Sequence, residues 1–413
     1  MHKFLKYTAV LYVMFLYGTW YERSEGGLSL NRLTGGLMLL AWGATKLADK
    51  SVRKPHPFIV SFGLYIAWVI LTVVWSLDQV AGLENGYRCV LLFGMCALVW
   101  DIFRTPEDVA LISRAVLIAA YVPVVRLIAN SHSGETSTDD YGRVTAGAFD
   151  PDAIGIILAI MIPVAWGMAI SKRETPWWIR ALGYAYPFCA AAGIALSGTR
   201  GAFLCSFPAW IFILLTIGRA SKWWRVGFAL FAVLAVIGFS TLDVSKQLQR
   251  FGSVGSSIKD EGMTGRLPIW RAGLDVFSHQ PFFGVGIGNF PVATAGYVGL
   301  SRVDGRPLPA HNTFLSVATE TGIVGFFLFM SAIGMVARSA SRMPKPERMP
   351  WIVALLVWGI GVSSISYDTY PHTWVLMILI VLNASQAAVP VVAARVGRWR
   401  HTPPQAPEMV SNG

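Results

Sequence analysis

Three residues combine a chemically useful side chain with a sequence setting that exposes it. Arg200 lies in the run SGTRGA, a predicted tight turn between two apolar segments. Arg266 lies in TGRLPIW, at the start of an amphipathic stretch, and His311 lies in AHNT, where polar sequence becomes apolar again. A guanidinium binds phosphate through paired hydrogen bonds, and an imidazole with a pKa near neutral serves as a general base. These residue types predict a site for a phosphate-bearing substrate.

Each of these residues also has a plainer interpretation, which the sequence leaves open. Arg200 would then be a turn arginine whose head group reaches the lipid headgroups. Arg266 would be a solvated loop residue, and His311 a structural histidine. Within the spans and at their edges charge is costly, which is why such positions are functional candidates.

Four further residues are candidates for supporting roles. Arg271 is close to Arg266 in sequence and could share its binding of pyrophosphate. Asn312 could cap the helix that follows it. Asp368, in a predicted turn, could orient His311 or an arginine, or be an ordinary turn aspartate. Arg88 is a weaker candidate.

Several familiar catalytic motifs are absent from the sequence. There is no nucleophile elbow, no phosphate-binding loop ending in GK[ST], no HExxH and no Cys/His cluster with metal-ligand spacing. The run GVGIG at 284–288 resembles a dinucleotide-binding loop in its glycines only, because no predicted strand precedes it. The four cysteines lie in or beside apolar segments, which favours core positions over disulfides: Cys89, Cys96, Cys189 and Cys205.

Composition indicates which elements must position these residues. Hydrophobic residues make up 54% of the 413 residues and charged residues only 14%, against about 25% in ordinary globular domains. Apolar runs of about 20 residues, the length that crosses a bilayer as a helix, alternate with short polar stretches. The sequence therefore predicts an all-α polytopic membrane protein. The net charge of +11 does not indicate nucleic-acid binding, because the basic residues lie mostly at span ends.

The apolar segments predict twelve transmembrane helices. They fall at about 5–20, 33–48, 58–76, 87–103, 109–129, 152–170, 178–197, 201–218, 223–240, 312–337, 350–366 and 373–392. Basic residues gather at alternate ends, which places both termini in the cytoplasm. Far fewer lie in the short segments predicted to face outward, namely Arg23, Arg32, Arg88, Arg143 and Arg200.

This topology divides the chain into four regions. Residues 1–240 contain helices one to nine, 241–311 form a large periplasmic loop, 312–392 contain helices ten to twelve, and 393–413 form a cytoplasmic tail. Long loops in compact proteins are usually functional. The amphipathic part of this loop could lie along the membrane interface. The smaller polar loop at 130–149 could be a lid or a substrate contact.

The same motifs carry a family resemblance. The chain resembles the O-antigen ligase and polymerase superfamily, most strongly over residues 190–335. The matching residues are the SGTRG turn, Gly265-Arg266 with Trp270, Pro281 with the 284–288 glycines and Asn289-Phe290, and His311-Asn312 with Leu315, Glu320-Thr321-Gly322 and Gly325. The twelve-helix topology with a large loop between helices nine and ten extends the resemblance along the chain.

The resemblance implies a GT-C-like glycosyltransferase of the bacterial inner membrane with a periplasmic active site. Its donor would be a glycan on undecaprenyl pyrophosphate, and its acceptor lipid A-core or a growing glycan. Arg200 and Arg266 would hold the pyrophosphate, His311 would take the proton of the acceptor hydroxyl, and Asp368 would support them. No cofactor and no divalent metal are expected, because the arginines supply the positive charge.

Three functions remain open at this point. The first is an O-antigen ligase in lipopolysaccharide biosynthesis, and the second is a polymerase of O-antigen or exopolysaccharide repeat units that uses the same donor. The third is a twelve-helix transporter or flippase. Transporters usually place charge near the membrane midplane and often show repeat symmetry. Here the candidate charges gather on one face and the two halves differ in loop size, which favours an enzyme.

Overall fold

The computed structural model describes residues 2–17, 30–132, 150–171, 174–241, 266–297, 308–366 and 368–387. Within these residues all regular structure is helical, which confirms the predicted all-α class. The helices are α1 (His2–Tyr17), α2 (Leu30–Asp49), α3 (Pro57–Thr72), η1 (Val73–Trp75), α4 (Gln79–Ile102), α5 (Pro106–Ala119), α6 (Tyr121–His132), α7 (Pro151–Ala169), α8 (Trp177–Ser197), α9 (Arg200–Thr216), η2 (Ile217–Arg219), α10 (Lys222–Thr241), α13 (Arg266–His279), α14 (Phe290–Thr294), α15 (Thr313–Ser341), α16 (Lys345–Val362) and α17 (Pro371–Ala387).

Within the described residues every predicted apolar segment coincides largely with helix, and six stretches of this part of the chain are long and apolar enough to cross a membrane. They are Pro57–Trp75, Pro106–Ser131, Pro151–Ala169, Trp177–Ser197, Arg200–Arg219 and Thr313–Ser341. The chain is thus a multi-pass membrane protein, while the count of twelve crossings and the orientation stay predictions. The segment predicted at 109–129 is divided between α5 and α6. The predicted tail, the loop residues 242–265 and 298–307, and residues 133–149 of the smaller predicted loop lie outside the described residues.

Helix α7 lies at the centre of one half of the fold, packed between α8, α9 and α16. Nearly all of its side chains are buried, as expected for a helix that is apolar on every side. Small residues allow close contact: a Cβ on Gly155 would lie 2.5 Å from the Ala202 side chain.

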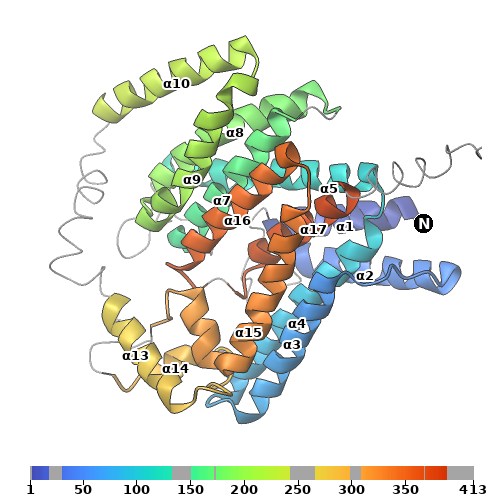
Figure 1. Cartoon of the computed structure of the whole chain (residues 1–413), viewed down its shortest axis with the longest axis vertical. Coiled ribbons are helices and arrows are strands. Elements are labelled where there is room, and N and C mark those ends of the chain that lie inside the picture. The colour runs from blue at the N-terminus through green and yellow to red at the C-terminus, as the bar shows by residue number, and fades with distance from the viewer. Residues whose placement is uncertain are drawn as a thin grey trace, which may run out of the picture.

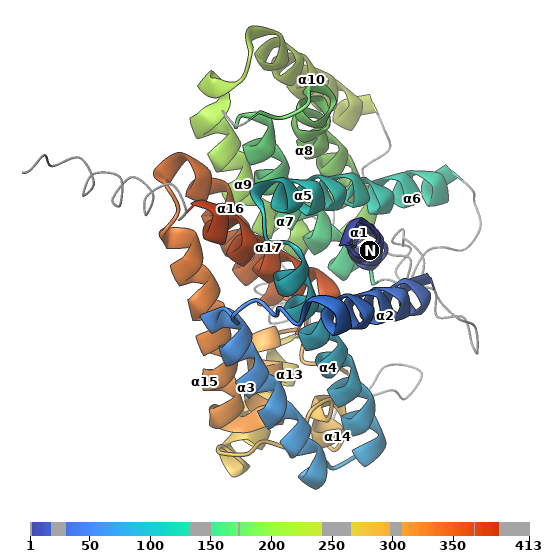
Figure 2. The same ribbon diagram turned by 90° about the vertical axis from the view of Figure 1, so that its right-hand side faces the viewer.

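The other half of the fold is built from α3, α4, α15 and α17, which pack through aromatic side chains. The ring of Phe62 in α3 stacks on Trp374 in α17 at a centroid distance of 3.8 Å, and Phe329 of α15 meets the same tryptophan edge-on. Figures 1 and 2 both place α3, α4 and α15 beside α13 and α14 at one end of the molecule.

Residues 266–297, called the α13–α14 module below, dock onto a kink in α15. At Gly322 the backbone has φ 66° and ψ −173°, a conformation essentially confined to glycine. The kink frees the carbonyl groups one turn earlier, and these accept hydrogen bonds from the loop between α13 and α14. The Thr319 carbonyl binds the Val285 N–H at 3.0 Å, and the Glu320 carbonyl binds the Gly286 N–H at 2.9 Å.

The glycine-rich loop at 284–288 therefore has a structural role. Its three glycines have φ values of 71°, 95° and 75°, and a Cβ at any of them would collide with a neighbouring segment. Asn289 links the loop to the start of α4, because its side-chain oxygen accepts from the Asp78 N–H at 2.6 Å. These contacts account for the glycines without a dinucleotide.

The expectation that the amphipathic part of the loop lies on the membrane interface is wrong for the apolar side of α13. Ile269 and Ala272 are buried against Phe290 and Ala310. Trp270 donates its ring N–H to the Ala310 carbonyl at 3.1 Å. The apolar side of α13 thus packs on protein, because the residues before α15 fold back over it.

Asp101 is the centre of a charged cluster near the end of α4. Its carboxylate, 5% exposed, binds Lys46 at 2.7 Å and Arg104, and accepts hydrogen bonds from Trp42 and the Arg53 backbone. The Arg53 guanidinium lies 3.5 Å from the Trp100 ring centroid. Basic residues from α2 and from the end of α4 thus meet at one buried carboxylate, which joins the two helices.

Replacing Asp101 by alanine is expected to destabilise the protein by about 3 kcal/mol, because Lys46 and Arg104 lose their buried partner. Thermal unfolding in detergent measures the change. A matched control is Glu84→Gln, which breaks the exposed 3.9 Å pair with Arg88 and should cost less than about 0.5 kcal/mol. Equal effects of the two substitutions would show that Asp101 does not organise this end of the fold.

Candidate functional site

Arg200 is the first residue of α9 and is placed beside the start of α7. Gly198 ends α8 in the left-handed conformation, with φ 61°, which turns the chain sharply. The Thr199 hydroxyl then donates to the Pro151 carbonyl at 3.0 Å. On the other side, a Cβ on Gly201 would lie 2.7 Å from the Ser364 hydroxyl. The predicted tight turn is confirmed, and it fixes Arg200 between α7 and the α16–α17 connection.

Arg266 is the first residue of α13 and reaches the same turn of α7. Its guanidinium lies 3.5 Å from the carboxylate of Asp152, and the two side chains are 24% and 14% exposed. Asp150 caps α7 by accepting the Asp152 N–H at 2.7 Å. The first turn of α7 is therefore the common neighbour of Arg200 and Arg266.

His311 precedes Asn312, the N-cap of α15, and has a strained backbone conformation. Its φ is +47°, in the left-handed region that residues other than glycine adopt uncommonly and at a cost in free energy. Asn312 follows as the predicted helix cap, confirmed by its side chain accepting the Leu315 N–H at 3.1 Å. The Thr313 hydroxyl donates to the Ile365 carbonyl at 2.7 Å. These contacts hold the imidazole-bearing residue at the start of the helix.

The contacts close into a ring around four helix N-termini. Thr199 joins α9 to α7, Arg266 joins α13 to α7, and Trp270 joins α13 to the residue before His311. The 363–366 connection completes the ring, since it contacts both Gly201 in α9 and Thr313 in α15. In Figure 1 α13 and α14 lie below α9, with α7 and α16 beside it. A helix N-terminus carries partial positive charge and unpaired N–H groups, so four of them with two arginines favour an anion.

Asp152 and Glu320 were not identified as site residues from the sequence. The sequence groups Asp152 only with the polar loop at 130–149, as a possible lid or substrate contact, although an aspartate that opens an apolar segment is a usable signal. Glu320 is 5% exposed, and its carboxylate accepts the backbone N–H groups of Gly288 at 2.9 Å and Phe290 at 3.1 Å. These two hydrogen bonds therefore attach the α13–α14 module, which includes Arg266, to α15. A carboxylate within a predicted span was the available signal for it.

Asp368 is buried behind the site in the turn before α17. Its carbonyl accepts the Trp374 ring N–H at 2.7 Å, and its carboxyl group interacts electrostatically with Glu320. Burial raises the pKa of Asp368 to about 6. The predicted support of His311 or an arginine by Asp368 stays a prediction.

The raised pKa of Asp368 gives a pH-dependent contribution to stability. The folded state holds this proton more tightly than the unfolded state, so the contribution of Asp368 to stability should fall as pH rises from about 4 to about 6 and stay constant above that range. The Asp368→Asn variant should show a flatter profile, with a difference on the order of 2 kcal/mol. Thermal unfolding across this pH range measures both. Parallel profiles of stability against pH for the wild type and Asp368→Asn would contradict the raised pKa of Asp368.

Two candidates are not brought into the ring. Arg271 lies on the exposed side of α13, and the structure shows no contact between it and the Arg266–Asp152 pair. Arg88 pairs with Glu84 on the exposed side of α4. Their proposed roles in donor binding or support stay predictions. Among the described residues, no three His, Cys, Asp or Glu side chains gather closely enough to hold a metal ion.

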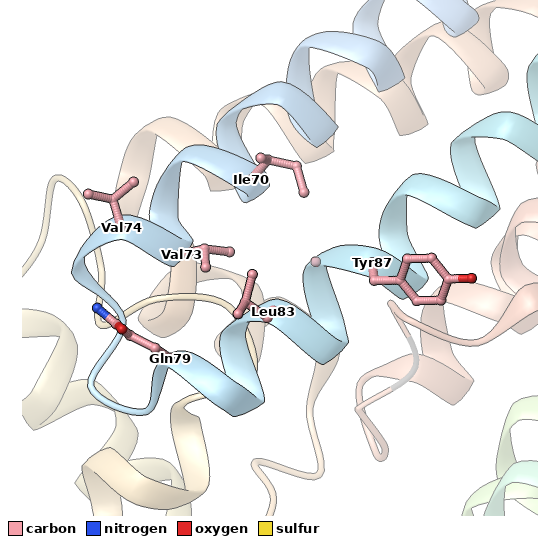
Figure 3. A pocket seen from close by; sticks show the side chains of 7 residues that line it. Ile70, Val73, Val74, Gln79, Leu83 and Tyr87 are labelled. Carbon is pink, nitrogen blue, oxygen red and sulfur yellow. The ribbon is translucent and has the colours of Figure 1, made fainter. Parts of the chain in front are cut away.

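One groove lies away from these residues. It has a volume of about 520 Å³ and lies between the end of α3 and the start of α4 (Figure 3). Its lining is mostly apolar, with Ile70, Val73, Val74, Leu83 and Tyr87 around Gln79. None of the candidate charged residues lines it, so the site is defined by its converging helix N-termini and arginines.

Comparisons with known proteins identify two similarities. Residues 185–330 match the family model described as O-antigen ligase, a range that contains Arg200, Arg266, His311 and Glu320. The chain is also 24% identical over 315 residues to the exopolysaccharide production protein ExoQ of Rhizobium meliloti strain 1021. That match covers 72% of this chain and 68% of the relative. Together these findings confirm the predicted resemblance of this membrane protein to the O-antigen ligase and polymerase superfamily.

Proposed function

We propose that this protein is a membrane glycosyltransferase that moves a glycan from undecaprenyl pyrophosphate to a sugar hydroxyl. The proposed site faces the periplasm, at the outer surface of the bacterial inner membrane. The observation that carries the proposal is the ring of four helix N-termini with Arg200 and Arg266 beside the first turn of α7. Such an arrangement suits the pyrophosphate of a lipid-linked donor.

The arginines would act on the leaving group. As the bond between the anomeric carbon and the pyrophosphate oxygen breaks, negative charge grows on the pyrophosphate. Preformed positive groups aimed at that position stabilise the transition state more than the ground state. Arg266 is held in place by Asp152, and Arg200 by the α8–α9 turn. In this proposal the arginines provide the charge that a divalent metal provides in other transferases.

His311 would accept the proton of the acceptor. The acceptor hydroxyl oxygen attacks the anomeric carbon, its proton passes to an imidazole nitrogen, and undecaprenyl pyrophosphate departs with the bonding electrons. The strained backbone at His311, held from both sides by Trp270 and Thr313, would keep the imidazole near the arginines. Positioning of a base in this way contributes typically 10²–10⁴-fold.

The acceptor decides between two versions of this function. As an O-antigen ligase, the protein would use lipid A-core and complete lipopolysaccharide. As a polymerase, it would extend a repeat-unit chain on the same donor. The similarity to an exopolysaccharide production protein across 72% of the chain favours keeping the polymerase as the second candidate.

A deletion strain complemented with wild type, Arg200→Ala, Arg266→Ala or His311→Ala tests the proposal. A lipopolysaccharide gel and analysis of lipid-linked glycans give the readout. If the deletion strain and the variant strains accumulate long glycan on undecaprenyl pyrophosphate and leave lipid A-core bare, the protein is a ligase. If they accumulate single repeat units, it is a polymerase. Lipid-linked donor retained on the inner face would indicate a flippase instead. Full complementation by all three variants would show that Arg200, Arg266 and His311 do not form the active site.

A further inference from the structure

Two phenylalanines are exposed at the tip of the α13–α14 module. Phe282 is 64% exposed and Phe283 59%. No charged residue lies between positions 280 and 290. Leaving large aromatic side chains in water costs free energy in proportion to their apolar area. An exposed apolar tip of this kind marks an interaction surface.

The tip is held firmly by the kink in α15. The Ile323 N–H, freed by the kink, donates to the Pro281 carbonyl at 2.7 Å. The Gly284 N–H donates to the Gln280 carbonyl at 3.1 Å, which closes the turn. Gly322 leaves room for the backbone, since a Cβ there would lie 2.2 Å from the Phe282 carbonyl oxygen. The two phenylalanines are thus presented on a fixed turn.

Contacts with α3 place this tip at membrane depth. The Phe283 ring lies 6.0 Å from the ring of Trp68 and 5.8 Å from that of Trp75, between centroids. Both tryptophans belong to the candidate span Pro57–Trp75, and Trp75 ends it. At 1.5 Å per residue, the tryptophans are separated by roughly 10 Å along the helix. The tip therefore lies beside the last part of a membrane span, where aromatic residues concentrate in membrane proteins.

The surfaces next to the tip are apolar and exposed as well. On α15 the exposed apolar residues are Ile323, Val324 and Phe327. At the end of the candidate span Pro57–Trp75 they are Leu71 and Val74. In the most apolar 18-residue stretch of α15 only 33% of the residues are buried, as expected for a span with a face toward lipid. The Phe282–Phe283 tip therefore adjoins two surfaces that are apolar and exposed, one on α15 and one at the end of the span Pro57–Trp75. Val74 also lines the apolar groove of Figure 3, so this surface extends toward α4.

We propose that the Phe282–Phe283 tip inserts into the bilayer and anchors the α13–α14 module in one leaflet. The partner is lipid: its acyl chains cover the two rings at the level of the α3 C-terminal end. The tip is the part of the module that enters the membrane, whereas the apolar side of α13 packs on protein. The anchor would fix the height of the module, whose first residue is Arg266, relative to the membrane surface.

The proposal is tested by attaching a nitroxide at position 282 in protein reconstituted into vesicles of phosphatidylethanolamine and phosphatidylglycerol. The four native cysteines are first replaced by alanine, and Phe282→Cys carries the label. Collisions with oxygen, which concentrates in lipid, are compared with collisions with a water-soluble nickel chelate. Phe327→Cys, on the exposed face of α15, is the lipid-facing control, and Ser278→Cys, exposed on α13, is the water-facing control.

We expect the oxygen-to-nickel ratio at position 282 to exceed that at position 278 several-fold and to approach that at position 327. A ratio equal to that at position 278 would overturn the proposal, because the tip would then lie in water. Low collision rates with both reagents would overturn it too, since a second copy or another protein would then cover the tip. Thermal unfolding of the labelled Phe282→Cys protein confirms that the fold is retained, and Phe283→Cys repeats the measurement at the adjacent residue.

Discussion

Replacing Arg266 by alanine is expected to lower the rate of glycan transfer roughly a hundredfold or more, because the departing pyrophosphate loses a preformed cationic partner. The loss has a second cause in this structure. Asp152, 3.5 Å from the guanidinium, would lose this cationic partner and would repel the anion. Transfer from purified lipid-linked donor in reconstituted vesicles measures the effect. Arg266→Lys should lie between wild type and alanine, since it keeps the charge but loses the planar fork.

A double-mutant cycle separates the two causes of this loss. Asp152→Asn combined with Arg266→Ala should recover part of the activity, because the repelling carboxylate is removed together with its partner. Arg225→Ala, an exposed arginine of α10, is the control for a general effect of removing positive charge and should keep wild-type activity. Retention of activity by Arg266→Ala would exclude it from donor binding, whatever the result of the cycle.

Replacing Gly322 by alanine is expected to detach the α13–α14 module from α15. The backbone there has φ 66° and ψ −173°, and a Cβ would lie within 2.6 Å of three backbone atoms of the Phe282–Phe283 segment. Backbone atoms cannot move aside as a flexible side chain does, so we expect a cost of at least about 2–3 kcal/mol. Transfer activity should fall with it, since Arg266 belongs to the displaced module.

Hydrogen exchange distinguishes local detachment from global unfolding. The amides of Val285, Gly286 and Gly288, which donate to Thr319 and Glu320, should lose protection in Gly322→Ala while those of α7 keep theirs. Gly334→Ala is the matched control on the same helix. A Cβ there meets no atom within 4 Å, so the change should be neutral or stabilising by up to about 1 kcal/mol. Unchanged protection in Gly322→Ala would show that the kink is dispensable for docking.

The sequence alone determined the helices and the residue types at their ends. An apolar run of membrane-spanning length must satisfy its backbone hydrogen bonds internally, so each run could only become helix. Local signals also sufficed for the turn at Gly198 and the cap at Asn312, because a turn and a cap depend on residues adjacent in the chain. The chemistry of Arg200, Arg266 and His311 was readable for the same reason.

Only the tertiary structure decided which of these residues share a site. Arg266 meets Asp152, which is 114 positions earlier in the chain, and Glu320 binds a loop 30 residues before it. Hydropathy and turn patterns depend on residues that are near one another in the chain, so they cannot identify a contact partner so distant in sequence. The packing of α7 against α9, and the kink that docks α13 onto α15, bring the four helix N-termini together. Arg271 and Arg88 have the same charge as Arg266, yet the helical periodicity of α13 and α4 turns them to exposed faces.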